Sequence, residues 1–224
     1  MNSTYAASRV RVQCAIGWGL VLAALLATVL PAPAAARAPE PATRAVLVMG
    51  DSLSAAYGLT PEQGWVALLA DRVARRAPGW RVVNASISGE TSAGGAARII
   101  DALARHRPAV VVIALGANDG LRGLPVLQTR IDLARMIGAA HGAGARVLLV
   151  GMRLPPNLGP DYTRDFAASY RLLAARFDVA LLPFLLEPIA LERDAYQADN
   201  LHPVAAVQPE LRDHVWTALA PLLD

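Results

Sequence analysis

The chain has 224 residues, of which 54% are apolar and 17% charged, and this balance excludes an intrinsically disordered protein. Its single cysteine is Cys14, and all 21 basic residues are arginines, so lysine Schiff-base chemistry and a P-loop lysine are excluded. The net charge of +3 falls to +1 without residues 1–36, where Arg9 and Arg11 are the only charges, and the remaining arginines are scattered, which argues against a nucleic-acid-binding surface.

The N-terminal segment has the three parts of a secretory signal peptide. Arg9 and Arg11 precede an apolar run at residues 14–30, and an Ala/Pro-rich stretch at 31–38 follows. These parts predict export, cleavage after Ala36, and a periplasmic or secreted mature protein without cysteine. An uncleaved membrane anchor is the alternative, because an apolar run of 17 residues reaches the lower limit of a spanning helix.

Residues 37–43 are predicted to form a short linker, and residues 44–224 a single α/β domain. Short apolar runs alternate there with amphipathic stretches, which is the pattern of repeated β-α units around a parallel sheet. In chain order the predicted elements are a strand at 45–49, a helix at 61–76, a strand at 80–85, a helix at 92–106, a strand at 109–115, a helix at 125–140, a strand at 146–150, a helix at 163–177, a strand at 179–184 and a helix at 204–223 that is kinked or restarted at Pro209. Right-handed crossovers then give a three-layer α/β/α, flavodoxin-like fold with a five-stranded parallel sheet, whose central strand is the very apolar 109–115.

Polar residues follow the C-terminal ends of the predicted strands, where the functional loops of such a sheet lie. The four polar segments are Gly50–Ser54, Ser86–Thr91, Gly116–Gly120 and Ala198–Pro203. A serine just beyond a strand, such as Ser52, exposes its hydroxyl near the positive end of a helix dipole. Taken alone, Ser52 is explained more simply as a helix cap.

Asp199 and His202 supply the other two members of a Ser-His-Asp triad. A carboxylate three residues before an imidazole can accept the Nδ1 proton and leave Nε2 free as a base for Ser52. The spacing is weak evidence by itself, and a metal site on the same pair lacks a third ligand in the sequence. The other three histidines lie in or at the ends of predicted helices, where structural roles explain them.

Acyl transfer also needs hydrogen-bond donors for the oxyanion of its tetrahedral intermediate. The N–H groups of Ser52 and Gly89 and the side-chain amide of Asn118 would supply three such donors. A turn glycine and an Asx turn explain Gly89 and Asn118 singly. These simple explanations do not account for both residues occurring together with a complete triad.

Four short blocks of the sequence resemble those of the SGNH (GDSL-type) hydrolases. The blocks are Gly50-Asp51-Ser52-Leu53, Gly89, Gly116-x-Asn118-Asp119 and Asp199-x-x-His202. Longer stretches (GDSLSA, VNASISGET, GANDGLRG, RLP and FDVALLPF) are similar to the exported multifunctional esterases within that family. The resemblance implies a two-step hydrolysis through an acyl-serine, with no metal or cofactor. It assigns these roles: Ser52 as nucleophile, His202 as general base and then acid, Asp199 as the carboxylate that orients His202, and Ser52, Gly89 and Asn118 as the oxyanion hole.

Three apolar loops that contain Pro or Gly are expected to form the substrate groove. They are residues 121–125, 154–162 and 185–191. Such walls suit an acyl chain or an aryl group. The candidate substrate-binding residues are Asp51, Leu53, Leu121, Leu154 and Pro155. We therefore expect a broad esterase and thioesterase for acyl and aryl substrates, including lysophospholipids.

Two other functions stay open. A carbohydrate O-acetyl esterase would use the same triad on short acyl groups. The chain has only 3 Phe, 4 Trp and 5 Tyr, which provide few aromatic side chains for a sugar to pack on. A non-catalytic flavodoxin-like domain would hold FMN or phosphate, but no phosphate loop follows the first strand and Asp51 would repel an anion there. As partners we expect a small-molecule ester, no nucleic acid and no stable membrane contact after cleavage, and we expect a monomer.

Overall fold

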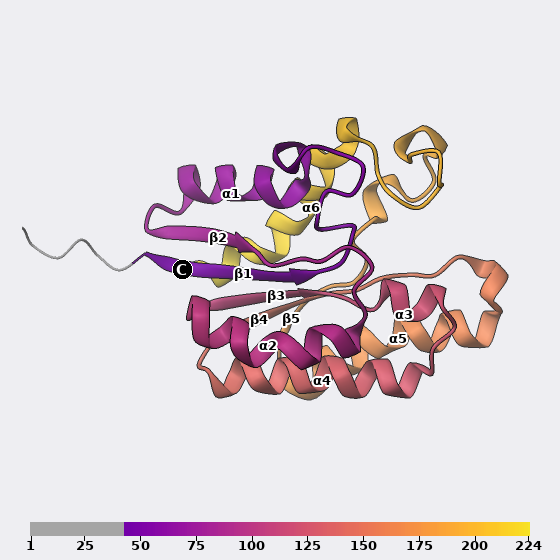
Figure 1. Ribbon diagram of the computed structural model, residues 1–224, viewed down its shortest axis with the longest axis horizontal. Coiled ribbons are helices and arrows are strands. Elements are labelled where there is room, and N and C mark those ends of the chain that lie inside the picture. The colour runs from indigo at the N-terminus through magenta and orange to yellow at the C-terminus, as the bar shows by residue number, and fades with distance from the viewer. Residues whose placement is uncertain (1–42) are drawn as a thin grey trace, which may run out of the picture. The chain divides into compact units, whose positions relative to one another are not determined.

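The computed structural model describes residues 43–224, which form a five-stranded parallel sheet between two helical layers (Figure 1). The strand order is β2-β1-β3-β4-β5, the order of a flavodoxin-like sheet, and all four pairings are parallel. The predicted fold class is therefore confirmed. The predicted signal peptide, and all but the last residue of the predicted linker, lie outside the described residues.

Strands and helices follow one another almost in strict alternation. The strands are β1 (Arg44–Gly50), β2 (Trp80–Asn84), β3 (Val110–Ala114), β4 (Arg146–Val150) and β5 (Ala180–Leu182). The α-helices are α1 (Trp65–Arg76), α2 (Ser92–His106), α3 (Ala117–Leu121), α4 (Val126–Gly142), α5 (Pro160–Phe177) and α6 (Gln208–Leu219). Short 3-10 turns lie between them at Pro61–Gln63, Pro156–Leu158, Glu187–Ile189, Arg193–Ala195, Ala205–Val207 and Ala220–Leu222.

Successive side chains of each strand enter two separate cores, one on each face of the sheet. Val46 and Val48 of β1 pack on the face that α1 and α6 cover, whereas Leu47 and Met49 pack on the face of α2, α4 and α5 (Figure 1). All four side chains are completely buried. Because both faces of the sheet are covered, its strands are continuous apolar runs in the sequence.

The helix α2 and the strand β4 have the predicted bounds, whereas the other predicted elements differ at one or both ends by one to four residues. β5 is shorter than 179–184, because the Val179 N–H donates to Ala174 O at the end of α5 (3.1 Å) and Pro183 has no N–H for the ladder. α5 begins at Pro160 rather than at 163. Residues in the first turn of a helix make no backbone N–H hydrogen bond within the helix, and the proline ring already fixes φ near its helical value.

A short helix, α3, occupies a segment that the sequence predicts as a loop. Asn118, Asp119 and Gly120 have low helix propensity, so the pattern gives no helical signal there. The buried Asp119 carboxylate accepts hydrogen bonds from Ser92 N (2.8 Å) and Ser92 Oγ (2.5 Å), and these tertiary bonds stabilise the short helix. At the other end of the chain, Pro209 lies in the first turn of α6, which confirms a restart of the last helix.

None of the helices among the described residues combines the length and the hydropathy needed to cross a membrane.

Candidate active site

Ser52, the candidate nucleophile, lies in a tight turn directly after β1. Ser54 N and Ala55 N both donate to Asp51 O, at 3.1 and 2.9 Å, and so close this turn. A Cβ at Gly50 would lie 2.6 Å from Ser54 Oγ, so only glycine fits at the end of the strand. The turn leaves Ser52 partly exposed at the edge of the sheet.

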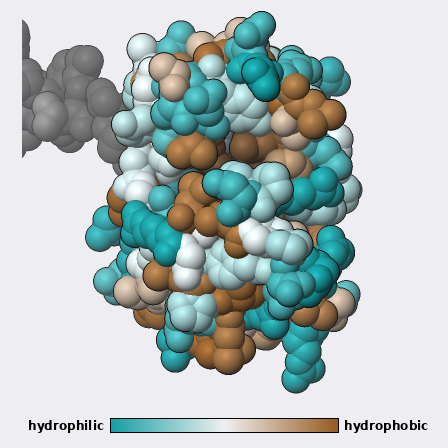
Figure 2. Space-filling model, turned by 90° about the vertical axis from the view of Figure 1, so that its right-hand side faces the viewer, coloured by the Kyte–Doolittle hydropathy of each residue, from teal (hydrophilic) through white to brown (hydrophobic). Residues whose placement is uncertain are grey.

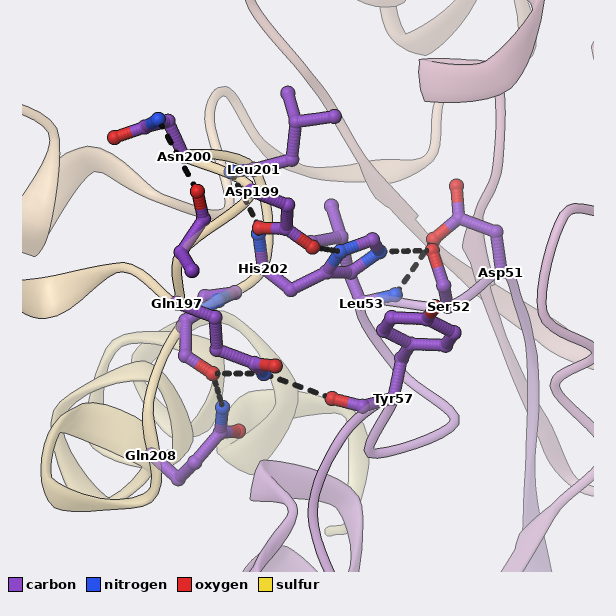
Figure 3. A network of polar contacts seen from close by, with 12 residues as sticks. Asp51, Ser52, Leu53, Tyr57, Gln197, Asp199, Asn200, Leu201, His202 and Gln208 are labelled. Atoms are coloured by element: carbon purple, nitrogen blue, oxygen red, sulfur yellow. Dashed lines mark hydrogen bonds and ion pairs between the residues drawn. The ribbon is translucent and has the colours of Figure 1, made fainter.

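Ser52, His202 and Asp199 form one chain of hydrogen bonds, although Ser52 precedes His202 by 150 residues (Figure 3). His202 Nε2 lies 2.8 Å from Ser52 Oγ, and His202 Nδ1 lies 2.6 Å from Asp199 Oδ2. An ionised carboxylate only accepts, so Nδ1 carries the ring proton and the Nε2 lone pair faces the Ser52 hydroxyl. The structure thus brings the three candidate catalytic residues together in the arrangement that general-base catalysis requires.

Asp199 is held in its ionised form by its own loop. Its Oδ1 accepts the N–H groups of His202 (3.0 Å) and Leu201 (2.9 Å), and its Oδ2 faces the imidazole. These bonds, first of all the one from the His202 N–H, lower the pKa of Asp199 to about 2. Asp199 therefore stays a carboxylate throughout the pH range in which a histidine acts as a base.

Residues that the sequence analysis missed contact His202 and stabilise the loop that carries it. The Tyr57 ring lies with its centroid 4.4 Å from that of His202. Gln197 Nε2 donates to Tyr57 O (2.9 Å) and to Pro203 O (3.1 Å), and Gln208 Nε2 donates to Pro203 O at 3.4 Å (Figure 3). Tyr57 and Gln197 are 140 residues apart, so no local pattern could have revealed their contact.

Asp51 lies beside the nucleophile but is only 1% exposed. Its Oδ1 accepts the Leu53 N–H at 3.0 Å, whereas its Oδ2 has no hydrogen-bond partner among the described residues. Burial raises the pKa of Asp51 to about 6. Ionisation of this carboxyl therefore costs free energy in the folded protein at neutral pH.

We expect Asp51→Asn to be more stable than the wild type above pH 6, by up to about 3 kcal/mol, and the difference to fall below about 1 kcal/mol near pH 4. The folded-state pKa lies above the ordinary value of 3.8, so the favourable contribution of the neutral carboxyl is complete below that value and is lost as the pH rises through about 6. Urea unfolding of both proteins at about pH 4, 6 and 8 measures the difference in unfolding free energy. The exposed Asp101, changed to Asn, is the control. A difference that is independent of pH would show that burial does not favour neutral Asp51.

The candidate oxyanion-hole residues come from two loops, which carry Ser52 and Gly89, and from helix α3, which carries Asn118. Gly89 has a φ of 81° in a turn that the Glu90 N–H closes by donating to Ile87 O (3.1 Å). Asn118 Nδ2 donates to Glu90 O at 3.0 Å, which places Asn118 beside the residue that follows Gly89. Ser52 and Asn118 border the cavity in front of the nucleophile, whereas Gly89 does not line it. The Asn118 amide keeps a second N–H that the bond to Glu90 does not use.

A cavity of about 420 Å³ opens beside Ser52 and His202. All five candidate substrate-binding residues line it: Asp51, Leu53, Leu121, Leu154 and Pro155. Most of the remaining wall is apolar, with the polar Arg153 and Asn200 beside Ala117, Met152, Pro156, Phe184, Leu186, Ala190, Tyr196 and Leu201. Figure 2 looks onto this edge of the molecule and shows hydrophobic side chains around a hollow. The wall is therefore suited to an acyl chain or another apolar group.

Comparisons with known proteins agree with this geometry. A family model described as GDSL-like Lipase/Acylhydrolase matches residues 48–208. Esterase TesA of Pseudomonas aeruginosa is 51% identical over 184 residues, which are 82% of this chain and 92% of that protein. Thioesterase 1/protease 1/lysophospholipase L1 of Escherichia coli K12 is 42% identical over 179 residues, 80% of this chain and 85% of that protein. The arylesterase of Vibrio mimicus is 40% identical over 174 residues, with coverages of 78% and 87%.

Solved structures share the fold. The crystal structure of TesA has a TM-score of 0.78 and covers 80% of this chain and 99% of its own, at 51% identity. The psychrotrophic esterase EstA from Pseudoalteromonas sp., inhibited by monoethylphosphonate, has a TM-score of 0.77 at 39% identity and covers 80% of this chain and 98% of its own.

Proposed function

The chain belongs to the GDSL-like lipase/acylhydrolase family, and on that basis we propose that it is a serine esterase that hydrolyses acyl and aryl esters and thioesters, lysophospholipids among them. The observation that carries the proposal is the chain of hydrogen bonds from Ser52 through His202 to Asp199 beside an apolar cavity. The names of the relatives, which include esterase, thioesterase, lysophospholipase and arylesterase, support the same chemistry.

Acylation begins when Ser52 Oγ attacks the carbonyl carbon of the substrate and its proton passes to His202 Nε2. Asp199, ionised and bonded to Nδ1–H, stabilises the resulting imidazolium. The carbonyl oxygen becomes an oxyanion that accepts hydrogen bonds from Ser52 N–H, Gly89 N–H and Asn118 Nδ2–H. When the intermediate collapses, the bond to the leaving group breaks, His202 gives its proton to that group, and an acyl-serine is left.

Deacylation repeats these steps with water. Water attacks the acyl carbon while His202 takes one of its protons, and a second tetrahedral oxyanion forms in the same hole. The bond between the acyl carbon and Ser52 Oγ then breaks, Ser52 recovers its proton from His202, and the carboxylic acid leaves. The mechanism uses side chains, backbone N–H groups and water alone.

We expect kcat/KM for p-nitrophenyl esters to rise about fourfold per methylene from acetyl to butyryl, because each buried CH₂ contributes about 0.8 kcal/mol. The rise should end once the chain fills the cavity. The measurement is a series from acetyl to palmitoyl, with Ser52→Ala as the control for background hydrolysis. Acyl-CoA thioesters and acetylated sugars are assayed beside it.

Two results would favour the other functions. Activity confined to acetyl groups, with acetylated sugars as the best substrates, would favour a carbohydrate O-acetyl esterase. Bound FMN or phosphate in a protein that turns over none of these esters would favour a flavodoxin-like binding domain.

We also propose that the protein is exported and acts as a monomer in the periplasm or outside the cell, on small-molecule esters. The arginines at 9 and 11 and the apolar run at 14–30 support export. The intact mass of the protein recovered from the periplasmic fraction should correspond to a chain that starts at Arg37. A full-length chain in the membrane fraction would instead support the uncleaved anchor, and sedimentation of the mature protein tests the monomer.

A further inference from the structure

The glycine of the proposed oxyanion hole is flanked by residues that are anchored to α3. Gly89 lies in the loop between β2 and α2. Asn118 Nδ2 donates to Glu90 O at 3.0 Å, and the buried Asp119 carboxylate accepts Ser92 N–H at 2.8 Å and Ser92 Oγ–H at 2.5 Å. Two consecutive residues of α3 therefore hold the chain on the C-terminal side of Gly89.

Arg122 extends this contact to Gly89 itself. Arg122 lies at the C-terminal end of α3, and its Nη2 donates to Gly89 O at 3.1 Å. No other hydrogen bond to that oxygen forms within residues 43–224. A Cβ at Gly89 would have Arg122 Nη2, at 3.9 Å, as the only described atom within 4 Å beyond its chain neighbours. Apart from the chain neighbours, no other described group lies this close to the site of a Cβ at Gly89. The position of Gly89 therefore depends on the bond from Arg122 and on the neighbouring residues of the chain.

Gly89 needs such a restraint because glycine has the widest backbone freedom. Its φ of 81° at the third position of a turn, closed from Glu90 N to Ile87 O, is the mark of a type II turn. The Gly89 N–H belongs to the peptide before the Gly89 Cα and the Gly89 C=O to the peptide after it, so the direction of the N–H depends on where the residue is held and on its φ and ψ. A bond to the Gly89 carbonyl fixes one side of the residue and thereby limits the directions that its N–H can take.

We propose that Arg122 is a positioning residue for ester hydrolysis, which restrains Gly89 by holding its carbonyl and so limits the movement of its N–H away from the oxyanion. This inference rests on the function proposed above. Arg122 is exposed and does not line the cavity, so it acts through Gly89 and not on the acyl chain. A bond from a guanidinium to a carbonyl is charge-assisted and therefore stronger than one between neutral groups.

Arg122→Ala is expected to lower kcat by about 10- to 100-fold and to change KM less than about twofold, because the donor is misplaced but not removed. The loss should be equal for p-nitrophenyl butyrate, a neutral ester, and for butyryl-CoA, whose leaving group is anionic. Arg122→Lys should recover part of kcat, since an ammonium also donates to a carbonyl, and millimolar guanidinium should partly restore the alanine variant. Arg171→Ala is the matched control, because Arg171 is exposed on α5 and forms no hydrogen bond or ion pair within residues 43–224.

Several outcomes would overturn the inference. An unchanged kcat for Arg122→Ala in an otherwise active enzyme would overturn it and leave the proposed function intact. A rise in KM confined to butyryl-CoA would also overturn it, because Arg122 would then bind the anionic leaving group directly. A kcat loss that follows a lower thermal midpoint, and that guanidinium does not restore, would show a structural role instead. Failure of the wild type to hydrolyse either substrate would refute the proposed function, and this inference with it.

Discussion

Replacing His202 with alanine is expected to lower kcat for p-nitrophenyl butyrate by about 10⁵- to 10⁶-fold. His202 Nε2 lies 2.8 Å from Ser52 Oγ, and in the proposed mechanism it takes the hydroxyl proton and later gives it to the leaving group. Without the imidazole, the hydroxyl stays protonated when it meets the ester, and the leaving group departs without an acid. Ser52→Ala should lose about as much, and the double variant little more, because the two residues act as a unit.

Asp199→Asn should lower kcat less, by about 10⁴-fold, because an amide can hold the imidazole in the wrong tautomer while keeping its place. The control is His141→Ala, since His141 is exposed in the last turn of α4 and should be dispensable. Activity is measured at a pH where the wild type is fully active, together with the thermal midpoint of each variant. If His202→Ala retained more than about one per cent of the wild-type kcat, the assignment of the general base would be wrong.

Asn118→Ala is the second substitution with a large expected effect, a fall in kcat of about 10²- to 10³-fold with little change in KM. In the proposed mechanism, the N–H of Asn118 that is not bonded to Glu90 donates to charge that develops only in the transition state, so its loss should affect the chemical step and not ground-state binding. Asn118→Asp should be at least as damaging, because it places a negative charge beside the oxyanion.

Asn157→Ala is the control for this experiment, since Asn157 is exposed in the 3-10 turn next to the cavity wall. Steady-state kinetics of the three variants with p-nitrophenyl butyrate separate kcat from KM. A higher KM with an unchanged kcat would show that Asn118 binds the substrate in its ground state and is not an oxyanion donor.

The sheet could be predicted from the sequence because its strands are buried on both faces. Uninterrupted apolar runs such as 146–150 therefore mark a strand directly, and the structure has β4 at those residues. The bounds of α2 likewise match its predicted range, since Thr91 caps its first turn by accepting the Gly94 N–H. The start of β5 could not be predicted, because it depends on how α5 ends, with the Val179 N–H bonded to Ala174 O.

The grouping of the site residues could be predicted for a topological reason. Parallel strands present their C-terminal ends at one edge, so loops distant in the sequence meet there. Ser52, His202 and Asp199 come into hydrogen-bond contact at this edge, as expected. The residues that follow each predicted strand could therefore be expected to lie close together in one site.

The supporting residues could not be predicted, because their roles depend on contacts across the fold. Tyr57 packs on His202 and is held by Gln197, yet neither residue belongs to a local pattern. The helix α3 forms from residues of low propensity because Asp119 is bonded to Ser92. Arg122 lies in the stretch GANDGLRG, but nothing in the sequence indicates its bond to Gly89.

The measurement that tests the catalytic assignment most directly is the location of a covalent adduct. A p-nitrophenyl alkylphosphonate releases p-nitrophenol when a serine nucleophile attacks its phosphorus, and it leaves a stable tetrahedral adduct on that serine. Wild type and Ser52→Ala are treated with the reagent, and peptide mass spectrometry locates the modification. We expect a single adduct on Ser52 of the wild type, with loss of esterase activity, and no adduct on Ser52→Ala. Inactivation with Ser52 unmodified, or an adduct on another residue, would contradict the role of Ser52 as the nucleophile.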